Sequence, residues 1–293
     1  MNPVEFLFPY LERELIEFKN MVEFAALQAG RKNVVRLVLS HTYAAKFCDD
    51  FKRHFPDFHV KRSPFGLENI FASSAFDVFQ KRIEGDDDAP VERAYYLGEL
   101  QAVEAARQAE AEDATSLEIG DLYGYPQCCS RGYDIIINNN GCWTQPYLRK
   151  SGTLQRVAAT ANRLATLVSP FLGYHFDYFP CTPTCPQSAQ ICEKNRSIIL
   201  NSELKNFVPL VDTHCRALVI GHRGQIFYYP LGEVPADGRH TLDGSEMMLL
   251  FTDQSQNVPL IEAIEIDGST VFVTLGGRRR ALSDTSISLW IFD

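Results

Sequence analysis

The chain has 293 residues, of which 45% are hydrophobic and 22% charged, and a formal net charge of −9 at pH 7. This length and apolar content can build a substantial core. The negative charge argues against a chain-wide nucleic-acid surface, because phosphate binding depends largely on Lys and Arg. Charges interrupt the N-terminal apolar residues within every turn, so the segment fits neither a signal peptide nor a membrane span, and we expect a cytoplasmic protein.

Residues 1–113 are predicted to form an α/β domain that resembles a three-layer unit. The expected elements are a helix or bent pair of helices over 3–29, a strand over 34–39, a helix over 42–54, a strand over 58–60, a helix over 76–83, a strand over 94–97 and a helix over 99–113. The strand, helix and strand between 34 and 60 form a βαβ unit, which favours a parallel sheet. The predicted fold class is therefore α/β.

The rest of the chain divides into two further predicted parts. Residues 114–205 form a helical, cysteine-bearing segment packed on the first domain, with helices after Cys129, over 153–168 and over 186–200. Residues 206–293 alternate β-branched and aromatic runs with turn signals, which predicts a small antiparallel β domain. Within it, the arginines at 278–280 follow two glycines and are expected at a charged hairpin turn.

Five of the eight cysteines fall into two clusters that are about fifty residues apart. The clusters consist of Cys128 and Cys129, and of Cys181, Cys185 and Cys192. Each cluster follows an aromatic-proline step, so the thiols are expected at turns that open into helices. Backbone N–H groups at a helix start favour negative charge and lower a cysteine's pKa, as a metal ligand or a nucleophile requires.

The spacing of these cysteines favours an iron–sulfur cluster over zinc. Structural zinc usually takes paired CxxC knuckles, and neither cluster is one. Adjacent cysteines are expected to point their side chains apart, whereas an iron–sulfur cluster accepts irregularly spaced ligands. We therefore predict an iron–sulfur site held by Cys128, Cys129, Cys181 and Cys185, with Cys192 as a fifth candidate ligand, and keep zinc as the alternative cofactor.

The three other cysteines have simpler interpretations. Cys48 lies on the apolar face of a predicted helix and is expected to pack as a small hydrophobe. Cys142 follows a helix-ending turn, and its spacing does not place it with either cluster. Cys215 either joins a site through His214 or begins a strand, and the strand is the preferred interpretation.

The cysteine segments also resemble those of a known family. Residues 124–129 read Gly-Tyr-Pro-Gln-Cys-Cys, and residues 180–185 read Pro-Cys-Thr-Pro-Thr-Cys. They resemble an uncharacterised prokaryotic family, known only as a domain of unknown function, that carries a Gly-Tyr-Pro-x-Cys-Cys segment and a later Pro-Cys-x-x-x-Cys segment. The resemblance covers about the middle third of the chain. It implies a shared site without implying an activity.

These observations lead to three functional hypotheses. The first is an iron–sulfur metalloenzyme that performs redox, sulfur-transfer or Lewis-acid chemistry on a small molecule or a modified residue, with His175 and Asp177 as acid–base groups. The second is a zinc-stabilised accessory or interaction module that works beside a partner enzyme. The third is a metal-free enzyme with Cys128 or Cys129 as nucleophile and His175 as base. The chain carries no standard nucleotide, phosphate or zinc-protease motif.

Overall fold

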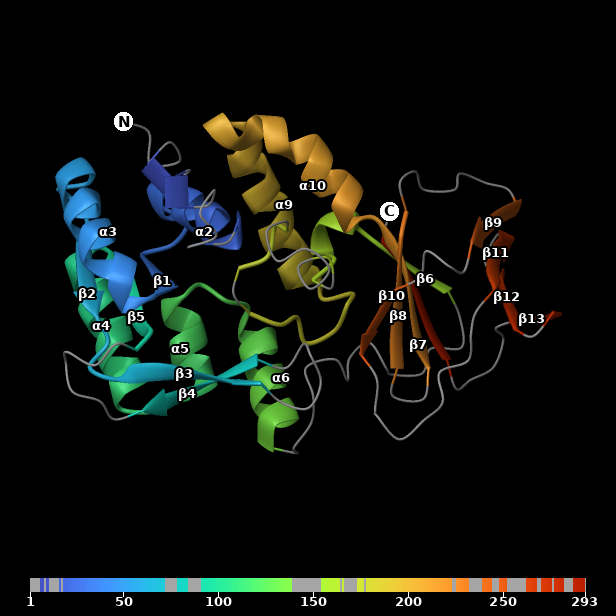
Figure 1. Cartoon of the computed structure of the whole chain (residues 1–293), viewed down its shortest axis with the longest axis horizontal. Helices are drawn as coiled ribbons and strands as arrows, with labels where there is room; N and C mark the ends of the chain where they lie inside the picture. The colour runs from blue at the N-terminus through green and yellow to red at the C-terminus, as the bar shows by residue number, and fades with distance from the viewer. Residues whose placement is uncertain are drawn as a thin grey trace.

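A computed structural model shows how these predicted parts are arranged (Figure 1). It describes residues 6–7, 9–10, 16, 18–71, 78–83, 91–138, 154–163, 165, 173–176, 178–222, 225–231, 239–243, 248–251, 262–267, 270–275, 277–281 and 287–292. The described residues mix helices with small sheets, so the predicted α/β class is confirmed. Among them, no helix is long and apolar enough to cross a membrane.

The N-terminal sheet has three strands in the order β1 (Val34–Leu39), β5 (Arg93–Gly98) and β2 (His59–Arg62). Strand β5 pairs antiparallel with both neighbours, so β1 and β2 run in the same direction without touching. The prediction of a parallel sheet was therefore wrong, because both pairings are antiparallel. The reason is that every residue of β5 is buried, and such a strand is most stable in the middle of the sheet.

Helices cover both faces of this sheet, which gives the predicted three layers (Figure 1). On one face, Leu37 and Leu97 pack with the aromatic residues of α2 (Phe18–Gln28) and α3 (His41–His54). On the other face, Tyr96 packs against α4 (Leu100–Ala111). Alternate strand residues thus point to opposite helical layers, as the two-residue period of a strand requires.

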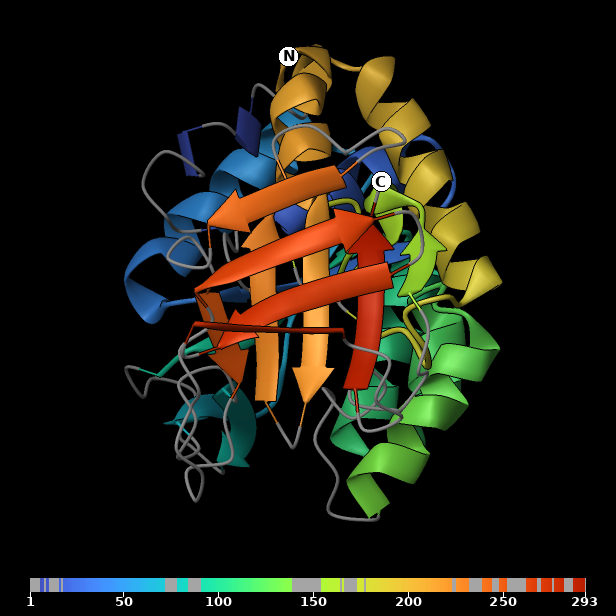
Figure 2. The same cartoon turned by 90° about the vertical axis from the view of Figure 1, so that its right-hand side faces the viewer.

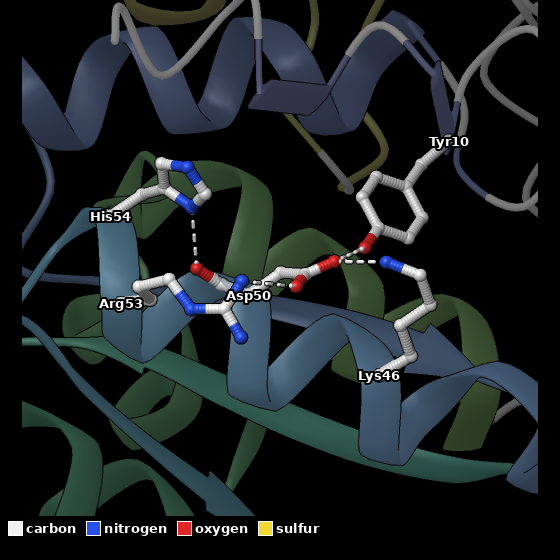
Figure 3. A network of polar contacts seen from close by, with 5 residues as sticks. All are labelled: Tyr10, Lys46, Asp50, Arg53 and His54. Atoms are coloured by element: carbon white, nitrogen blue, oxygen red, sulfur yellow. Dashed lines mark hydrogen bonds and ion pairs between the residues drawn. The ribbon is translucent and has the colours of Figure 1, made fainter.

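The first described residues are anchored on α3. The hydroxyl of Tyr10 donates to Asp50 Oδ2 at 3.0 Å, and the same carboxylate accepts from Lys46 and, at 3.4 Å, from Arg53 (Figure 3). The ring of Phe6 packs on the aromatic side chains of α3. The N-terminal segment is therefore held to α3 by both polar and apolar contacts.

Two predicted helices are strands instead. Residues 78–83, predicted as helix, form β4 (Val78–Ile83) in a hairpin with β3 (Gly66–Phe71). The segment predicted as a helix from 153 contains β6 (Leu154–Val157), followed by a 3₁₀ turn, η1 (Ala159–Ala161). Strand β6 pairs in parallel with a strand from the end of the chain, and such distant pairing overrides local helix propensity.

The helices that carry or support the cysteines follow the prediction in part. The observed helices are α5 (Ser116–Leu122), α6 (Gln127–Asn138), α9 (Pro186–Leu200), η2 (Glu203–Phe207) and α10 (Val208–Cys215). Helices after Cys129 and over 186–200 were expected, but the helix over 116–122 and the two helical segments between 203 and 215 were not, and residues 208–215 fall in the predicted β domain. Helix α9 occupies the predicted range of 186–200, with proline at its first position. Arg196 and Asp212 join α9 to α10 through an ion pair at 2.6 Å.

The C-terminal strands form two sheets. The larger has the order β10 (Met248–Phe251), β8 (Gln225–Pro230), β7 (Ala217–His222), β14 (Ile287–Phe292) and β6, and the smaller has the order β13 (Arg278–Ala281), β12 (Thr270–Leu275), β11 (Ala263–Asp267) and β9 (Arg239–Asp243). Apart from the β6–β14 pair, every pairing in them is antiparallel. The arginines at 278–280 were expected at a hairpin turn but lie in strand β13, and Gly277, with φ 69°, directly precedes them.

Both faces of the five-stranded sheet are covered. On one face, Tyr228 and Phe292 pack with the helical part of the chain, including Ala189 of α9. On the opposite face, Leu218 and Phe227 are also buried. Figure 2 shows the four-stranded sheet lying across this second face, with its strands crossing those beneath. The sheet therefore forms the middle layer between the cysteine-bearing helices and the smaller sheet.

Candidate metal centre

The first cysteine pair is positioned by the turn between α5 and α6. Gly124, with φ 71°, ends α5 in the left-handed conformation, and the N–H of Tyr125 donates to the carbonyl of Gly120 at 2.7 Å. These two features form a Schellman motif, which reverses the chain directly after a helix. Helix α6 then starts so that Cys128 and Cys129 lie in its first turn.

The second cysteine segment is positioned by the start of α9. Cys185 is the N-cap of α9, and its Sγ accepts a hydrogen bond from the N–H of Ser188 at 3.5 Å. Pro186 occupies the first helical position, where its missing N–H costs nothing. A turn closed by the N–H of Cys185 and the carbonyl of Thr182, at 3.1 Å, leads back to Cys181.

The two segments meet because α6 presents a glycine to Cys181. A Cβ placed on Gly132 would lie 2.8 Å from the Cβ of Cys181, a distance that real Cβ atoms essentially never show. Beside this contact, the rings of Tyr125 and Tyr178 pack at 5.0 Å between centroids. Tyr125 also stacks on Tyr123 at 5.7 Å, so aromatic side chains join the two cysteine segments.

A buried lysine connects this aromatic group to the N-terminal domain. Lys32 Nζ lies 2.7 Å from Glu23 Oε1, and the two side chains are 0% and 2% exposed. The same ammonium lies 4.2 Å from the ring centroid of Phe176 and 5.3 Å from that of Tyr125. Sequence reasoning missed Lys32, because a lysine between a helix stop and a strand has the pattern of an exposed loop residue.

Four thiols converge where these elements meet. The Sγ atoms of Cys128, Cys129, Cys181 and Cys185 all lie within 4.8 Å of one another. Cys185 Sγ is 3.6 Å from both Cys128 Sγ and Cys129 Sγ, and the last two are 3.9 Å apart. The expectation that adjacent cysteines point apart was therefore wrong. Side chains in a helix lean toward its N-terminus, so two in the first turn can reach the same space.

The surroundings favour negative charge on these sulfurs. Three of the thiols lie at helix starts, Cys128 and Cys129 in the first turn of α6 and Cys185 at the N-cap of α9. The N–H of Cys181 donates to Cys129 Sγ at 3.4 Å, and Ser188 donates to Cys185 as described above. Helix N-termini and N–H donors stabilise thiolates. The group is thus suited to binding a cation.

The thiols cannot all ionise without a cation. Hydrogen bonds from Cys129 and Cys181 lower the pKa of Cys185, whereas hydrogen bonds with Cys181 and Cys185 raise the pKa of Cys129. Sulfurs this close share protons, because like charges at such distances repel strongly. A bound divalent ion removes this restriction, since it deprotonates the thiols that coordinate it.

Two of the predicted cysteine assignments concern residues outside this group. Cys192, the fifth candidate ligand, is fully buried in α9 and is not one of the four thiols, and burial raises its pKa. Cys48 is half-buried in α3 and packs against the core, as predicted, and burial raises its pKa to about 11. Both are available as internal controls for experiments on the four-thiol group.

Of the two remaining cysteines, the structure describes only Cys215, which is not one of the four thiols. Cys215 is the last residue of α10 and does not begin a strand, because β7 starts only at Ala217. His214 Nε2 donates to the carbonyl of Ala165 at 2.8 Å. Cys142 lies outside the described residues.

The predicted acid–base pair can be assessed only in part. His175 is 0% exposed, and neither ring nitrogen makes a hydrogen bond of good geometry. Burial, followed by the charge of Arg163, lowers its pKa to about 3, and the backbone of Ala161 opposes this shift. The imidazole is therefore neutral and enclosed in the core. Asp177 lies outside the described residues, so the role of the pair stays a prediction.

No protein-family model, no curated protein and no solved structure matches the chain. The resemblance of residues 124–129 and 180–185 to an uncharacterised family stays a prediction. A functional interpretation of the protein thus depends on the four-thiol group and its surroundings.

Proposed function

We propose that the chain binds one metal ion through the thiolates of Cys128, Cys129, Cys181 and Cys185, and that this ion is zinc. The observation that carries the proposal is the spacing of the sulfurs. Zinc–thiolate bonds of about 2.3 Å in a tetrahedron place the sulfurs about 3.8 Å apart. The separations among Cys128, Cys129 and Cys185, which are 3.6, 3.6 and 3.9 Å, agree with that value, and Cys181 Sγ lies within 4.8 Å of the other three.

The same spacing favours a single ion over an iron–sulfur cluster. In a cluster, inorganic sulfide separates the irons, so thiolates on different irons lie further apart than thiolates on one ion. The four Sγ atoms here all lie within 4.8 Å of one another. Four soft thiolates in tetrahedral geometry are the ligand set that structural zinc sites use most.

A site with four protein ligands is closed, which favours a stabilising role for the ion. Catalytic zinc keeps a coordination position for water or substrate, and here four cysteines fill all the positions of a tetrahedron. The ion would join the turn before α6 to the turn before α9. Through Lys32, this junction contacts the N-terminal domain as well. These contacts support a zinc-stabilised accessory or interaction module.

Metal analysis of anaerobically purified chain tests the proposal directly. We expect one zinc per chain and a colourless protein, and cobalt substitution should produce the visible bands of a tetrahedral tetrathiolate. A brown protein with more than one iron per chain and acid-labile sulfide would overturn the proposal in favour of a cluster.

Serine variants identify the ligands. We expect Cys185→Ser to lose most of its zinc, because Cys185 also caps α9 and lies closest to two other sulfurs. Cys192→Ser is the matched control, since it alters a buried thiol of the same helix that lies outside the group. Equal zinc content in the two variants would contradict the assignment of Cys185.

A further inference from the structure

The four thiols form two unlike pairs. Cys129 and Cys185 are 1% and 2% exposed, and each Sγ accepts a backbone N–H. Cys128 and Cys181 are only partly buried. In the described part of the chain, no backbone N–H donates to the sulfur of either. One side of the group is therefore enclosed and hydrogen-bonded, and the other side faces solvent.

The two partly buried thiols also differ from each other. Cys181 lies against α6 at Gly132, where there is no space even for a methyl group. Cys128 lies beside the exposed side chain of Gln187, whose Oε1 accepts from its Sγ at 3.4 Å, a bond that exists only while Cys128 is a thiol and that a metal-bound thiolate would lose. The preceding residue, Gln127, is exposed as well. Cys128 is thus reached from solvent beside the amide of Gln187. The amide of Gln127, in contrast, donates to Asp121 Oδ1 at 3.4 Å, a negative charge that disfavours an anionic electrophile.

A closed tetrathiolate site can react at sulfur even though its metal has no open position. Coordination keeps the thiolates deprotonated at neutral pH, and the thiolate is the nucleophilic form of cysteine. Hydrogen bonds to a coordinated sulfur withdraw charge from it and change its reactivity. Cys129 and Cys185 carry such bonds, whereas Cys128 combines solvent access with the lack of a described N–H donor.

We infer that Cys128 is the reactive thiolate of this centre and that it accepts an alkyl group from a small, uncharged, soft electrophile. The inference rests on the proposed tetrathiolate metal site. In the step, a lone pair of Cys128 Sγ attacks the electrophilic carbon, a carbon–sulfur bond forms, and the leaving group departs with the electrons of its bond to carbon. The thiolate becomes a neutral thioether, so the charge of a zinc tetrathiolate changes from −2 to −1.

The change in charge gives the reaction a consequence for the fold. A thioether is a weaker ligand for zinc than a thiolate, because it carries no negative charge. Alkylation of Cys128 would therefore loosen the ion while leaving the hydrogen-bonded thiolates of Cys129 and Cys185 in place. Reaction with the electrophile would therefore lower the affinity of the centre for its metal ion.

Limited alkylation of the zinc-loaded chain tests the inference. Less than one equivalent of iodoacetamide is added at pH 7, the labelled cysteines are identified by peptide mass spectrometry, and free zinc is followed with a chromogenic chelator. We expect Cys128 to be labelled about tenfold or more faster than Cys48, which has no metal and whose burial raises its pKa to about 11. Zinc release should follow labelling.

The possible results separate this inference from the proposed function. Zinc-loaded chain in which Cys128 reacts no faster than Cys48, or in which Cys181 reacts first, overturns the inference and leaves the metal site intact. A chain that binds no metal overturns both. The variant Cys128→Ala provides a second test, because the fast phase of alkylation should disappear in it. A fast phase that persists in this variant would show that another thiol is responsible.

Discussion

The four-thiol centre is partly buried and the five-stranded sheet is covered on both faces, and different forces hold the two regions together. The sheet encloses apolar side chains on both faces, such as Phe292 and Leu218, and its strands satisfy one another's backbone groups. The centre gathers four ionisable thiols, and the buried Lys32–Glu23 pair contacts the aromatic side chains of the two cysteine segments. The sheet is therefore stabilised by packing and hydrogen bonds of the chain itself. The four thiolates, in contrast, need a compensating positive charge to lie this close together.

Removal of the metal should produce the largest difference in stability between the four-thiol centre and the five-stranded sheet. Structural zinc contributes about 10–16 kcal/mol of apparent binding free energy in small zinc-binding peptides. We expect chelation to lower hydrogen-exchange protection in the first turns of α6 and α9, while amides of β7 and β14 stay protected. Equal loss of protection in the two regions would show that the sheet depends on the ion as well.

The opposite perturbation removes apolar contacts from the sheet. Phe292 is 0% exposed, so Phe292→Ala should lower the free energy of unfolding by about 3–5 kcal/mol, in urea titrations with or without zinc. Leu210→Ala is the control, because Leu210 is 56% exposed and its loss should change stability by no more than about 0.5 kcal/mol. A large drop in the zinc affinity of Phe292→Ala would contradict the independence of the two regions.

Lys32→Met tests whether charge balance holds the centre together. The variant leaves Glu23 unpaired in the core, and breaking a buried pair costs about 3–5 kcal/mol. We expect lower stability and weaker zinc binding, because the ammonium also contacts the rings beside both cysteine segments.

Two further variants show whether the loss of stability in Lys32→Met comes from the broken ion pair. Lys46→Met removes a cation that is 67% exposed and should cost at most about 1 kcal/mol. The double variant Lys32→Met with Glu23→Leu should recover part of the lost stability, because no unpaired charge remains. No recovery would indicate that the ammonium–aromatic contacts dominate over the ion pair.

Gly132→Ala should affect the centre alone and by a smaller amount. The added Cβ would lie 2.8 Å from the Cβ of Cys181, so Cys181 must move, and overpacking costs about 1–3 kcal/mol. Alanine also favours helix by about 1 kcal/mol, which partly offsets that cost in overall stability but not in metal binding. Competition titrations should thus show weaker zinc binding with little change in the unfolding midpoint of the chelated chain. Unchanged zinc affinity would show that Cys181 can shift away from residue 132 without disturbing the metal site.

The smallest expected effect on stability comes from Asp212, which lies in α10 between the four-thiol centre and the five-stranded sheet. Burial raises the pKa of Asp212, but hydrogen bonds from Arg196 and Tyr174 outweigh it and lower the pKa. Because the folded pKa is the lower one, the pair stabilises the protein above the ordinary carboxyl pKa, and this is lost as the pH falls through the folded value. In chelated chain, Asp212→Asn should flatten the acid side of the stability curve by about 1 kcal/mol or less. An unaltered curve would exclude this contribution.

The sequence supports some parts of this structure much better than others. Pro186 after a cysteine predicts the start of α9, and apolar runs predict most strands, because these signals are local. The same local reasoning identified Cys128, Cys129, Cys181 and Cys185 as the preferred metal ligands, and these are the thiols that the fold brings together.

The parts that sequence reasoning missed depend on distant contacts. Strand β6 was predicted as helix, because the strand that pairs with it, β14, is far away in the sequence and local patterns do not show the pairing. Lys32 was overlooked because its surroundings come from α2, the turn before α6 and Phe176. The sulfur spacing that favours one ion over a cluster is likewise a property of the assembled centre. Periodicity and spacing along one chain contain none of this information.

The parallel pairing of β6 with β14 has a consequence for the order of events during synthesis. Strand β14 leaves the ribosome after both α6 and β6, because it follows them in the chain, and β6 follows the thiols of α6. Until β14 arrives, β6 has no partner on its paired edge, and exposed strand edges invite intermolecular pairing. A nascent chain can thus gather its metal ligands while its sheet is still incomplete. Release of a chain truncated before Ile287 should yield aggregation through β6 and β7 even when zinc is bound, which sedimentation can measure.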